Sequence, residues 1–228
     1  MKKMSFISDL LGSLGQIVVA SILWVFCCLP MFTIGPACTA LYYSVVKVIR
    51  RERGNMLEAY FHAFKLNFWQ SMGWNLLLLS YYAVLALLAF LHIRTTGGFV
   101  LDNTMGVILA FAVLLVWMLP FLYPVISRFF YKGFALLRFL LYIAIRYFWV
   151  TLIALALLIA AVVLFLSNSA LLLFLPGIYT LILSWMLEPI FKTLSTDDGS
   201  LSYQEWYDDT DSVRWTEQVA RAFRKKEQ

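Results

Sequence analysis

Few residues in this chain combine a reactive side chain with a position that could serve chemistry. Glu188 is an acid within a long apolar stretch, and Asn75 is a polar amide near the start of another. A carboxylate inside a membrane span is a functional candidate by default, because burying its charge costs about 2.5–3.5 kcal/mol. Glu188, however, comes four residues before Lys192, near the end of its stretch, where water and Lys192 can stabilise it. We therefore expect a structural role for Glu188. For Asn75 we expect a hydrogen bond to a neighbouring helix, with contact to a ligand as the alternative.

The other reactive residues do not form a catalytic or metal-binding pattern. Cys27, Cys28 and Cys38 are the only cysteines. The histidines, His62 and His92, lie in separate segments, so we expect the thiols to serve as packing groups. The sequence has no phosphate-binding glycine loop with its lysine, no His-Glu-x-x-His helix and no Gly-x-Ser-x-Gly turn. These observations predict a protein that is not an enzyme and that uses no metal or cofactor.

The segments that hold these residues are long apolar stretches, each near the roughly 20 residues that cross about 30 Å of hydrocarbon. Six spans are predicted, at residues 10–29, 31–49, 71–91, 105–127, 147–166 and 170–191. Hydrophobic residues make up 62% of the chain, and only Lys47 and Glu188 place a charge within the spans. The sequence therefore predicts an all-α membrane protein. We expect a polytopic helical bundle over residues 1–194 and a soluble acidic tail with a terminal helix over residues 195–228.

The distribution of basic residues predicts the orientation, because Lys and Arg in short loops stay on the cytoplasmic side. Six crossings with both termini in the cytoplasm keep 17 of the 18 basic residues inside and leave only Arg94 outside. The second span is the weakest, since Gly35 and Pro36 interrupt its start. If it is re-entrant, five crossings export Lys2 and Lys3 and divide the basic residues 15 to 3. The net charge of +5 thus reflects membrane orientation, and we expect the lipid bilayer, not nucleic acid, as the partner.

A tight helical hairpin is predicted between the first two spans. Its residues are Pro30, Thr33, Gly35 and Pro36. Proline lacks a backbone N–H and restricts the residue before it, so Pro30 is expected to end the first helix. Pro36 suits the first turn of the helix that follows.

Two amphipathic segments are predicted to lie in the cytoplasmic headgroup plane. Residues 55–70 place Phe61, Phe64 and Phe68 on one face and Glu58, His62 and Lys65 on the other. Residues 129–146 are similar but more hydrophobic, and they are expected to continue into the fifth span. The candidate docking or interfacial residues are Phe61, Phe64, Lys65 and Phe68. They either anchor the chain in the membrane or bind a partner.

Two motifs resemble a known family. They are Trp24-Val-Phe-Cys-Cys-Leu-Pro-Met-Phe-Thr-Ile-Gly-Pro-Ala-Cys-Thr-Ala-Leu-Tyr-Tyr43 and Phe61-His-Ala-Phe-Lys-Leu-Asn-Phe68. Both are similar to the YesL family of bacterial membrane proteins, a domain of unknown function, over roughly the first 90 residues. The resemblance implies a multi-pass protein of a Gram-positive plasma membrane, often encoded beside carbohydrate-uptake systems. It carries over no catalytic residues.

Three functions remain open from the sequence. The first is a non-enzymatic accessory or regulatory component of carbohydrate uptake, whose partner is a carbohydrate ABC transporter permease or a membrane sensor. The second is a small solute transporter that binds solute between the spans broken by Pro30, Gly35, Pro36 and Pro120. The third is a signalling scaffold that acts through the acidic tail. A polar central cavity favours transport, whereas a packed bundle with exposed aromatic side chains favours the other two.

Overall fold

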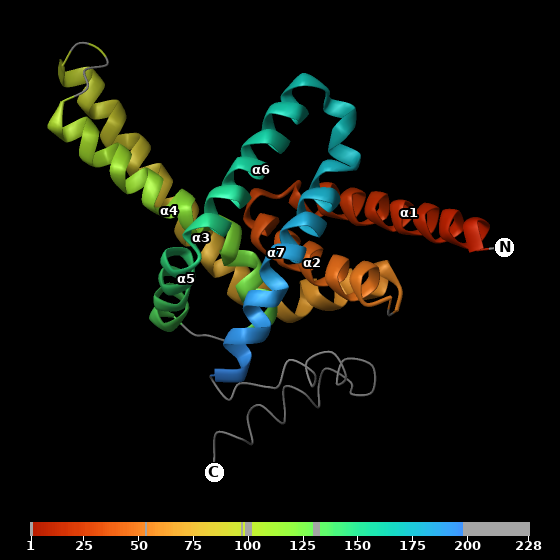
Figure 1. Cartoon of the computed structure of the whole chain (residues 1–228). Helices are drawn as coiled ribbons and strands as arrows, with labels where there is room; N and C mark the ends of the chain where they lie inside the picture. The colour runs from red at the N-terminus through yellow and green to blue at the C-terminus, as the bar shows by residue number, and fades with distance from the viewer. Residues whose placement is uncertain (1, 53, 97, 99–101, 130–132, 198–228) are drawn as a thin grey trace. The chain divides into compact units, whose positions relative to one another are not determined.

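The computed structural model describes residues 2–52, 54–96, 98, 102–129 and 133–197, and every secondary-structure element within them is helical. The predicted all-α class is therefore confirmed (Figure 1). The α-helices are α1 (Lys2–Cys28), α2 (Ile34–Ser44), α3 (Met56–Thr96), α4 (Asn103–Arg128), α5 (Phe134–Arg146), α6 (Phe148–Ser167) and α7 (Leu175–Asp197). The 3₁₀ segments η1 (Met31–Thr33) and η3 (Ser169–Leu173) and the π-helical segment η2 (Val45–Arg50) complete the described structure.

The chain divides into two compact units, Met1–Leu181 and Ile182–Gln228. The first unit holds α1 to α6 and the start of α7, and the second holds the remainder of α7. Of the tail and terminal helix predicted for residues 195–228, all but the last turn of α7 lies outside the described residues. The predicted boundary at residue 194 therefore stays a prediction.

α2 forms the centre of the first unit, where it contacts α1, α3 and α4. Nine of its eleven residues are buried. Small side chains such as Ala37 and Ala40, both 0% exposed, allow the neighbouring helices to approach closely. The buried hydroxyl of Thr39 donates to the carbonyl oxygen of Gly35, and that of Ser44 donates to the carbonyl oxygen of Leu41, in the same helix. Both hydroxyls therefore have a hydrogen-bond partner.

The predicted hairpin between the first two spans is present. α1 ends at Cys28, η1 turns the chain, and Pro36 lies in the first turn of α2. The Thr33 hydroxyl lies 2.6 Å from each of the carbonyl oxygens of Cys27 and Pro30 and donates to them. The bond to Cys27 satisfies an acceptor that the end of α1 leaves without a helical partner. The Pro30 carbonyl oxygen, which follows α1, also accepts the Thr33 backbone N–H at 2.9 Å.

α3 joins two helices that the sequence analysis expected to be separate. The interfacial helix predicted at residues 55–70 and the span predicted at residues 71–91 form one helix of 41 residues. At about 1.5 Å rise per residue it is roughly 60 Å long, about twice the hydrocarbon thickness. Neither Gln70 nor Ser71 interrupts the helix. The change from charged to uncharged residues near Gln70 therefore marks a change from polar to apolar surroundings along one continuous helix.

α4 returns beside α3, and the two helices form the long hairpin seen at the upper left of Figure 1. α4 continues through Pro120 and Pro124 without ending, so Pro120 does not break this span in the way that a discontinuous transporter helix requires. α5 packs on α4 through Leu136, Leu140 and Ile143, all buried. It is separated from α6 by one residue, Tyr147, close to the continuation expected from sequence.

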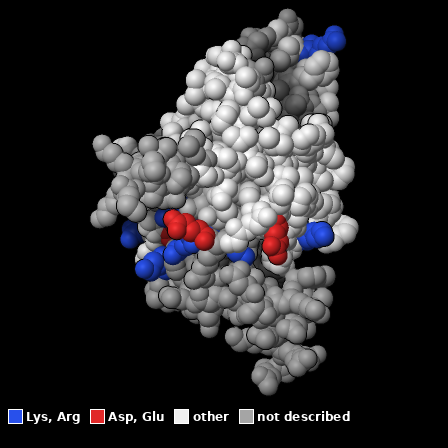
Figure 2. All heavy atoms as spheres, turned by 90° about the vertical axis from the view of Figure 1, so that its right-hand side faces the viewer, with Lys and Arg blue, Asp and Glu red and all other residues white. Residues whose placement is uncertain are grey.

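Four helical segments of the described residues are long and apolar enough to cross a membrane: Met31–Arg50, Met56–Thr96, Asn103–Arg128 and Phe148–Ser167. Gly12–Cys28 is a shorter apolar helix, and α7 is not among the four. Figure 2 shows a face on which most charged side chains form a band, with a broad uncharged surface above it and a further basic group at the far end of that surface. The protein is thus a membrane helical bundle. That α1 and α7 also cross the membrane, as six crossings require, stays a prediction.

Candidate functional site

Asn75 lies where α3 meets both the hairpin and α4. Its side-chain Nδ2 donates to the carbonyl oxygens of Met31 at 3.1 Å and Phe32 at 3.5 Å. Its Oδ1 accepts a hydrogen bond from the Tyr123 hydroxyl at 3.2 Å. The residue is 4% exposed, so these partners replace water. Asn75 therefore bridges three helical elements, which is the role that its position in the sequence suggested.

Gly35 brings α2 against the same part of α3. A Cβ atom added to Gly35 would overlap the carbonyl oxygen of Ser71 and would lie 2.9 Å from the Cβ of Asn75. Gly35 does not have a positive φ, so the turn itself does not require glycine. The requirement is the close approach of two backbones. We call Gly35, Ser71, Asn75 and Tyr123 the hairpin junction.

Two members of the hairpin junction were missed in the sequence analysis. Ser71 belongs to a stripe of small and polar residues at four-residue spacing on α3: Ala63, Asn67, Ser71 and Asn75, all buried. The Asn67 amide donates to the Ala63 carbonyl oxygen, and the Ser71 hydroxyl donates to the Asn67 carbonyl oxygen. That spacing was a usable signal. Tyr123 gave no comparable signal, because tyrosine is also enriched at membrane–water interfaces, where it needs no partner from another helix.

The hairpin junction contains amides, hydroxyls and backbone carbonyls but no acid, base or thiolate. Nearby, the indole Nε1 of Trp24 contacts the Sγ of Cys38 at 3.3 Å, and all three cysteines are free thiols. Within the residues that the structure describes, no three His, Cys, Asp or Glu residues are grouped as metal ligands would be. The arrangement is suited to holding helices together.

The aromatic face predicted on the first part of α3 is only partly exposed. Phe61 is 44% exposed, whereas Phe64 lies between the rings of Tyr60 and Phe68, at centroid distances of 6.4 and 5.5 Å. Lys65 is exposed, as expected. Phe61 is therefore a better candidate contact for a partner than Phe64.

Two neighbours differ from the sequence expectation on this part of α3. His62 was expected to face water, but it is half-buried with its ring centroid 6.3 Å from that of Tyr43 in α2. Trp69 was not selected from sequence, yet it is 77% exposed. Aromatic exposure thus continues to Trp69, at the end of the predicted segment 55–70.

Glu188 lies in α7, within the second unit, and its side chain is 2% exposed. The sequence analysis placed it near water and Lys192. Lys192 is exposed, but Glu188 is not, and both residues have interaction partners in the structure. Glu188 is therefore a buried acid of the second unit.

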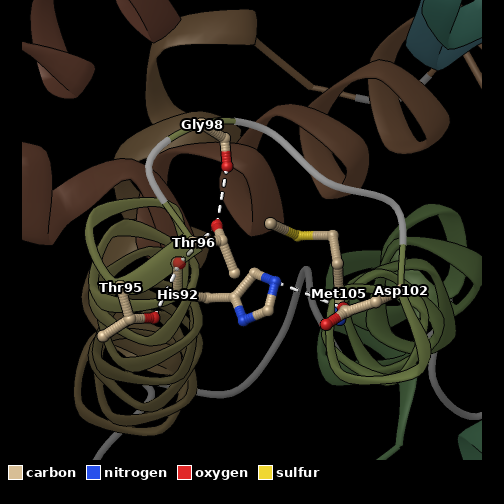
Figure 3. A network of polar contacts seen from close by, with 6 residues as sticks. All are labelled: His92, Thr95, Thr96, Gly98, Asp102 and Met105. Atoms are coloured by element: carbon tan, nitrogen blue, oxygen red, sulfur yellow. Dashed lines mark hydrogen bonds and ion pairs between the residues drawn. The ribbon is translucent and has the colours of Figure 1, made fainter.

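A second polar cluster closes the turn between α3 and α4 (Figure 3). The imidazole Nε2 of His92 lies 3.2 Å from Oδ1 of Asp102, and the same oxygen accepts the backbone N–H of Met105 at 2.9 Å. Asp102 is thus the N-cap of α4 as well as the partner of His92. The hydroxyls of Thr95 and Thr96 donate to the His92 carbonyl oxygen on the α3 side. The cluster fixes the α3–α4 hairpin at its tip.

A hollow with a volume of about 670 Å³ lies among α3, α4 and α5. We call it the α3–α5 cavity. Its surface is almost entirely apolar, and Gln70, Trp74 and Tyr81 are its polar or partly polar members. The Tyr81 hydroxyl already donates to the carbonyl oxygen of Phe111 at 3.1 Å. This is not the polar central cavity expected of a solute carrier.

A family model described as "Protein of unknown function, DUF624" matches residues 17–91. No curated protein and no solved structure matches the chain. The matched stretch begins at Ile17, a buried residue of α1, and runs through α2 to Leu91 of α3. It therefore contains the hairpin and three of the four residues of the hairpin junction. The matched family has no assigned function, and neither has the family that the sequence resembles. The YesL relationship stays a prediction.

Proposed function

We propose that this protein is a non-enzymatic accessory or regulatory component of a bacterial plasma membrane, with both termini in the cytoplasm. The observation that carries this proposal is the hairpin junction. Its amide and hydroxyl groups bond to protein partners within the bundle, and the α3–α5 cavity beside it is apolar. A carrier for a polar solute requires polar groups that face the solute, and these groups face other helices instead.

Exposed aromatic side chains on α3 support binding to a partner. Phe61 and Trp69 are 44% and 77% exposed and lie near Lys65, where the charged part of α3 meets its apolar part. Aromatic anchors of this kind carry much of the binding energy in protein interfaces. The partner we propose is a carbohydrate ABC transporter permease or a membrane sensor. That choice rests on the family resemblance alone.

Co-purification from the native cells tests the proposal. A tagged chain is expressed with and without sugar induction, extracted in mild detergent, and its bound proteins are quantified by mass spectrometry. Phe61→Ala should reduce recovery of the permease or sensor by about 30-fold, the equivalent of the ~2 kcal/mol of a strong interface residue. The matched control is Phe111→Ala, because Phe111 is similarly exposed, at 52%, but lies within the apolar part of α4.

Three results would contradict parts of this proposal. Equal recovery with Phe61→Ala, at an unchanged membrane level, would remove α3 as the docking surface. A reduced membrane level with normal recovery per molecule would show that Phe61 anchors the helix in the headgroup region instead. Uptake of solute by the purified protein alone in liposomes would establish a transporter.

A further inference from the structure

The α3–α5 cavity has a buried floor and an open rim. The floor consists of Leu78, Met118, Leu122 and Leu140, each at most 8% exposed. At the rim, Leu77 is 52% exposed and Phe134 is 82% exposed. An apolar hollow of about 670 Å³ lies within the roughly 300–1,000 Å³ range of small-molecule sites. Because it opens through apolar side chains, its natural occupant is also apolar.

The cavity extends over about half the thickness of a bilayer. It follows α3 from Gln70 to Tyr81, which is about 17 Å at 1.5 Å per residue. The hydrocarbon core is about 30 Å thick, so one leaflet contributes about half of that length. Gln70 lies five residues after Lys65, the last charged residue of α3 before Arg94. The cavity thus begins near the headgroup level and ends near the bilayer centre, which are the two ends of an acyl chain.

A basic side chain lies at the end of the cavity where α4 ends, because the ring of its neighbour Phe139 packs 5.1 Å from that of Phe129, the residue after α4. Phe134 at the rim and Arg138 share one face of α5, one turn apart, and Arg138 is exposed. Within the part of the chain that the structure describes, Arg138 has no hydrogen-bond or ion-pair partner. An unpaired guanidinium at this level attracts a lipid phosphate, which it can bind through two parallel hydrogen bonds.

We propose that the α3–α5 cavity binds one acyl chain of an anionic phospholipid, with the lipid phosphate at the Arg138 face of α5. The proposal explains why Phe134 is so exposed at the rim of an apolar hollow, since a lipid chain would cover it. It does not depend on the protein partner proposed above. Each of the two contacts can be changed separately.

Gly73 offers a way to fill the cavity without disturbing the fold. It lines the cavity, and a Cβ atom added there would meet no other atom within 4 Å. Gly73→Leu should therefore occupy the lipid's space, while removal of a glycine from a helix interior favours folding. The matched control is Gly15→Leu on α1, where an added Cβ atom also meets nothing within 4 Å. If Gly73→Leu lowers the folded yield, Leu77→Trp at the rim fills the same space.

The experiment uses the full chain in nanodiscs of phosphatidylcholine and phosphatidylglycerol. After transfer to detergent, native mass spectrometry counts the lipids that stay bound. Wild type and Gly15→Leu should retain one phosphatidylglycerol, and Gly73→Leu should reduce that population by at least about tenfold. Arg138→Gln should abolish the preference for phosphatidylglycerol over phosphatidylcholine. Arg146→Gln, two turns further along α5, should leave that preference intact.

Three outcomes would overturn the proposal. The first is a wild-type protein that retains no lipid under these conditions. The second is equal retention by Gly73→Leu or Leu77→Trp and the wild type, which would place any bound lipid elsewhere. The third is a different hydrophobic molecule that wild type retains and Gly73→Leu does not, which would keep the site but exclude a phospholipid as its occupant.

Discussion

Gly35 and Gly15 are both helical glycines, but only Gly35 lies against another helix. A methyl group at Gly35 would overlap the Ser71 carbonyl oxygen, whereas one at Gly15 would meet nothing within 4 Å. We therefore expect Gly35→Ala, and more strongly Gly35→Val, to reduce the folded yield and lower the thermal midpoint in detergent. Gly15→Ala should match or slightly exceed wild type, by up to about 1 kcal/mol of helix propensity.

Size-exclusion chromatography and thermal unfolding of the purified variants measure both effects. A normal yield of Gly35→Ala with an unchanged midpoint would show that α2 and α3 can separate at little cost. Selective loss of an uptake phenotype at normal yield would instead identify the hairpin as a functional site.

Asn75 and Tyr123 should depend on each other for their contribution to stability. Tyr123→Phe removes one hydrogen bond of the Asn75 side chain, and Asn75→Leu removes that bond together with those to Met31 and Phe32. Inter-helical hydrogen bonds in membranes average about 0.6 kcal/mol in double-mutant cycles. We expect a coupling energy of that size when both single variants and the double variant are unfolded in mixed micelles. Fully additive losses would show that the two side chains do not interact.

The sequence predicted part of the hairpin junction, for identifiable reasons. Pro30 and Pro36 impose local backbone rules, so the hairpin could be placed without knowledge of its neighbours. Asn75 stood out because an amide in an apolar helix needs a partner. The identity of that partner, Tyr123, depends on how α4 is rotated relative to α3. Helix rotation is set by packing over the whole interface, which single residues do not reveal.

Among the elements, α3 shows how composition and helix boundaries differ. After Lys65 the next charged residue of α3 is Arg94, and the sequence analysis divided the helix a few residues after Lys65. A polarity boundary reports where a membrane surface lies, whereas a helix ends only at a breaker or a cap. No such signal occurs before Thr96, where Gly97-Gly98 follows. The α3 and α4 ends at that turn were therefore predictable.

Asp102 should stabilise the α3–α4 hairpin mainly as a helix cap. Its Oδ1 accepts the Met105 N–H, and the side chain is 42% exposed, so the contact with His92 is weakened by solvent. We expect Asp102→Ala to destabilise the protein by about 1 kcal/mol, as loss of an N-cap usually does. Asp102→Asn keeps an acceptor at the cap and should cost much less. Thermal unfolding in detergent measures both, and equal losses would assign the stabilisation to the charge contact with His92.

For the whole molecule, the number of crossings depends on α1, on α7 and on whether the second predicted span, residues 31–49, is re-entrant. The apolar part of α1, Gly12–Cys28, is about 25 Å long at 1.5 Å per residue, slightly short of a bilayer core. α7 contains Pro189 and the buried Glu188. The distribution of basic residues nevertheless favours two full crossings by these helices, because only Arg94 is then outside.

Cysteine labelling in intact cells tests this topology. In a background without Cys27, Cys28 and Cys38, single cysteines are placed at Lys3, Thr96 and Gln228 and exposed to a membrane-impermeant maleimide. We expect the cysteine at Thr96 to be labelled in intact cells, because it lies at the tip of the α3–α4 hairpin beside Arg94. The cysteines at Lys3 and Gln228 should react only after permeabilisation. Labelling at Lys3 from outside, with Gln228 still protected, would establish five crossings and a second span that enters and leaves on one side. Labelling at Gln228 but not at Lys3 would show instead that α7 is not the final return crossing.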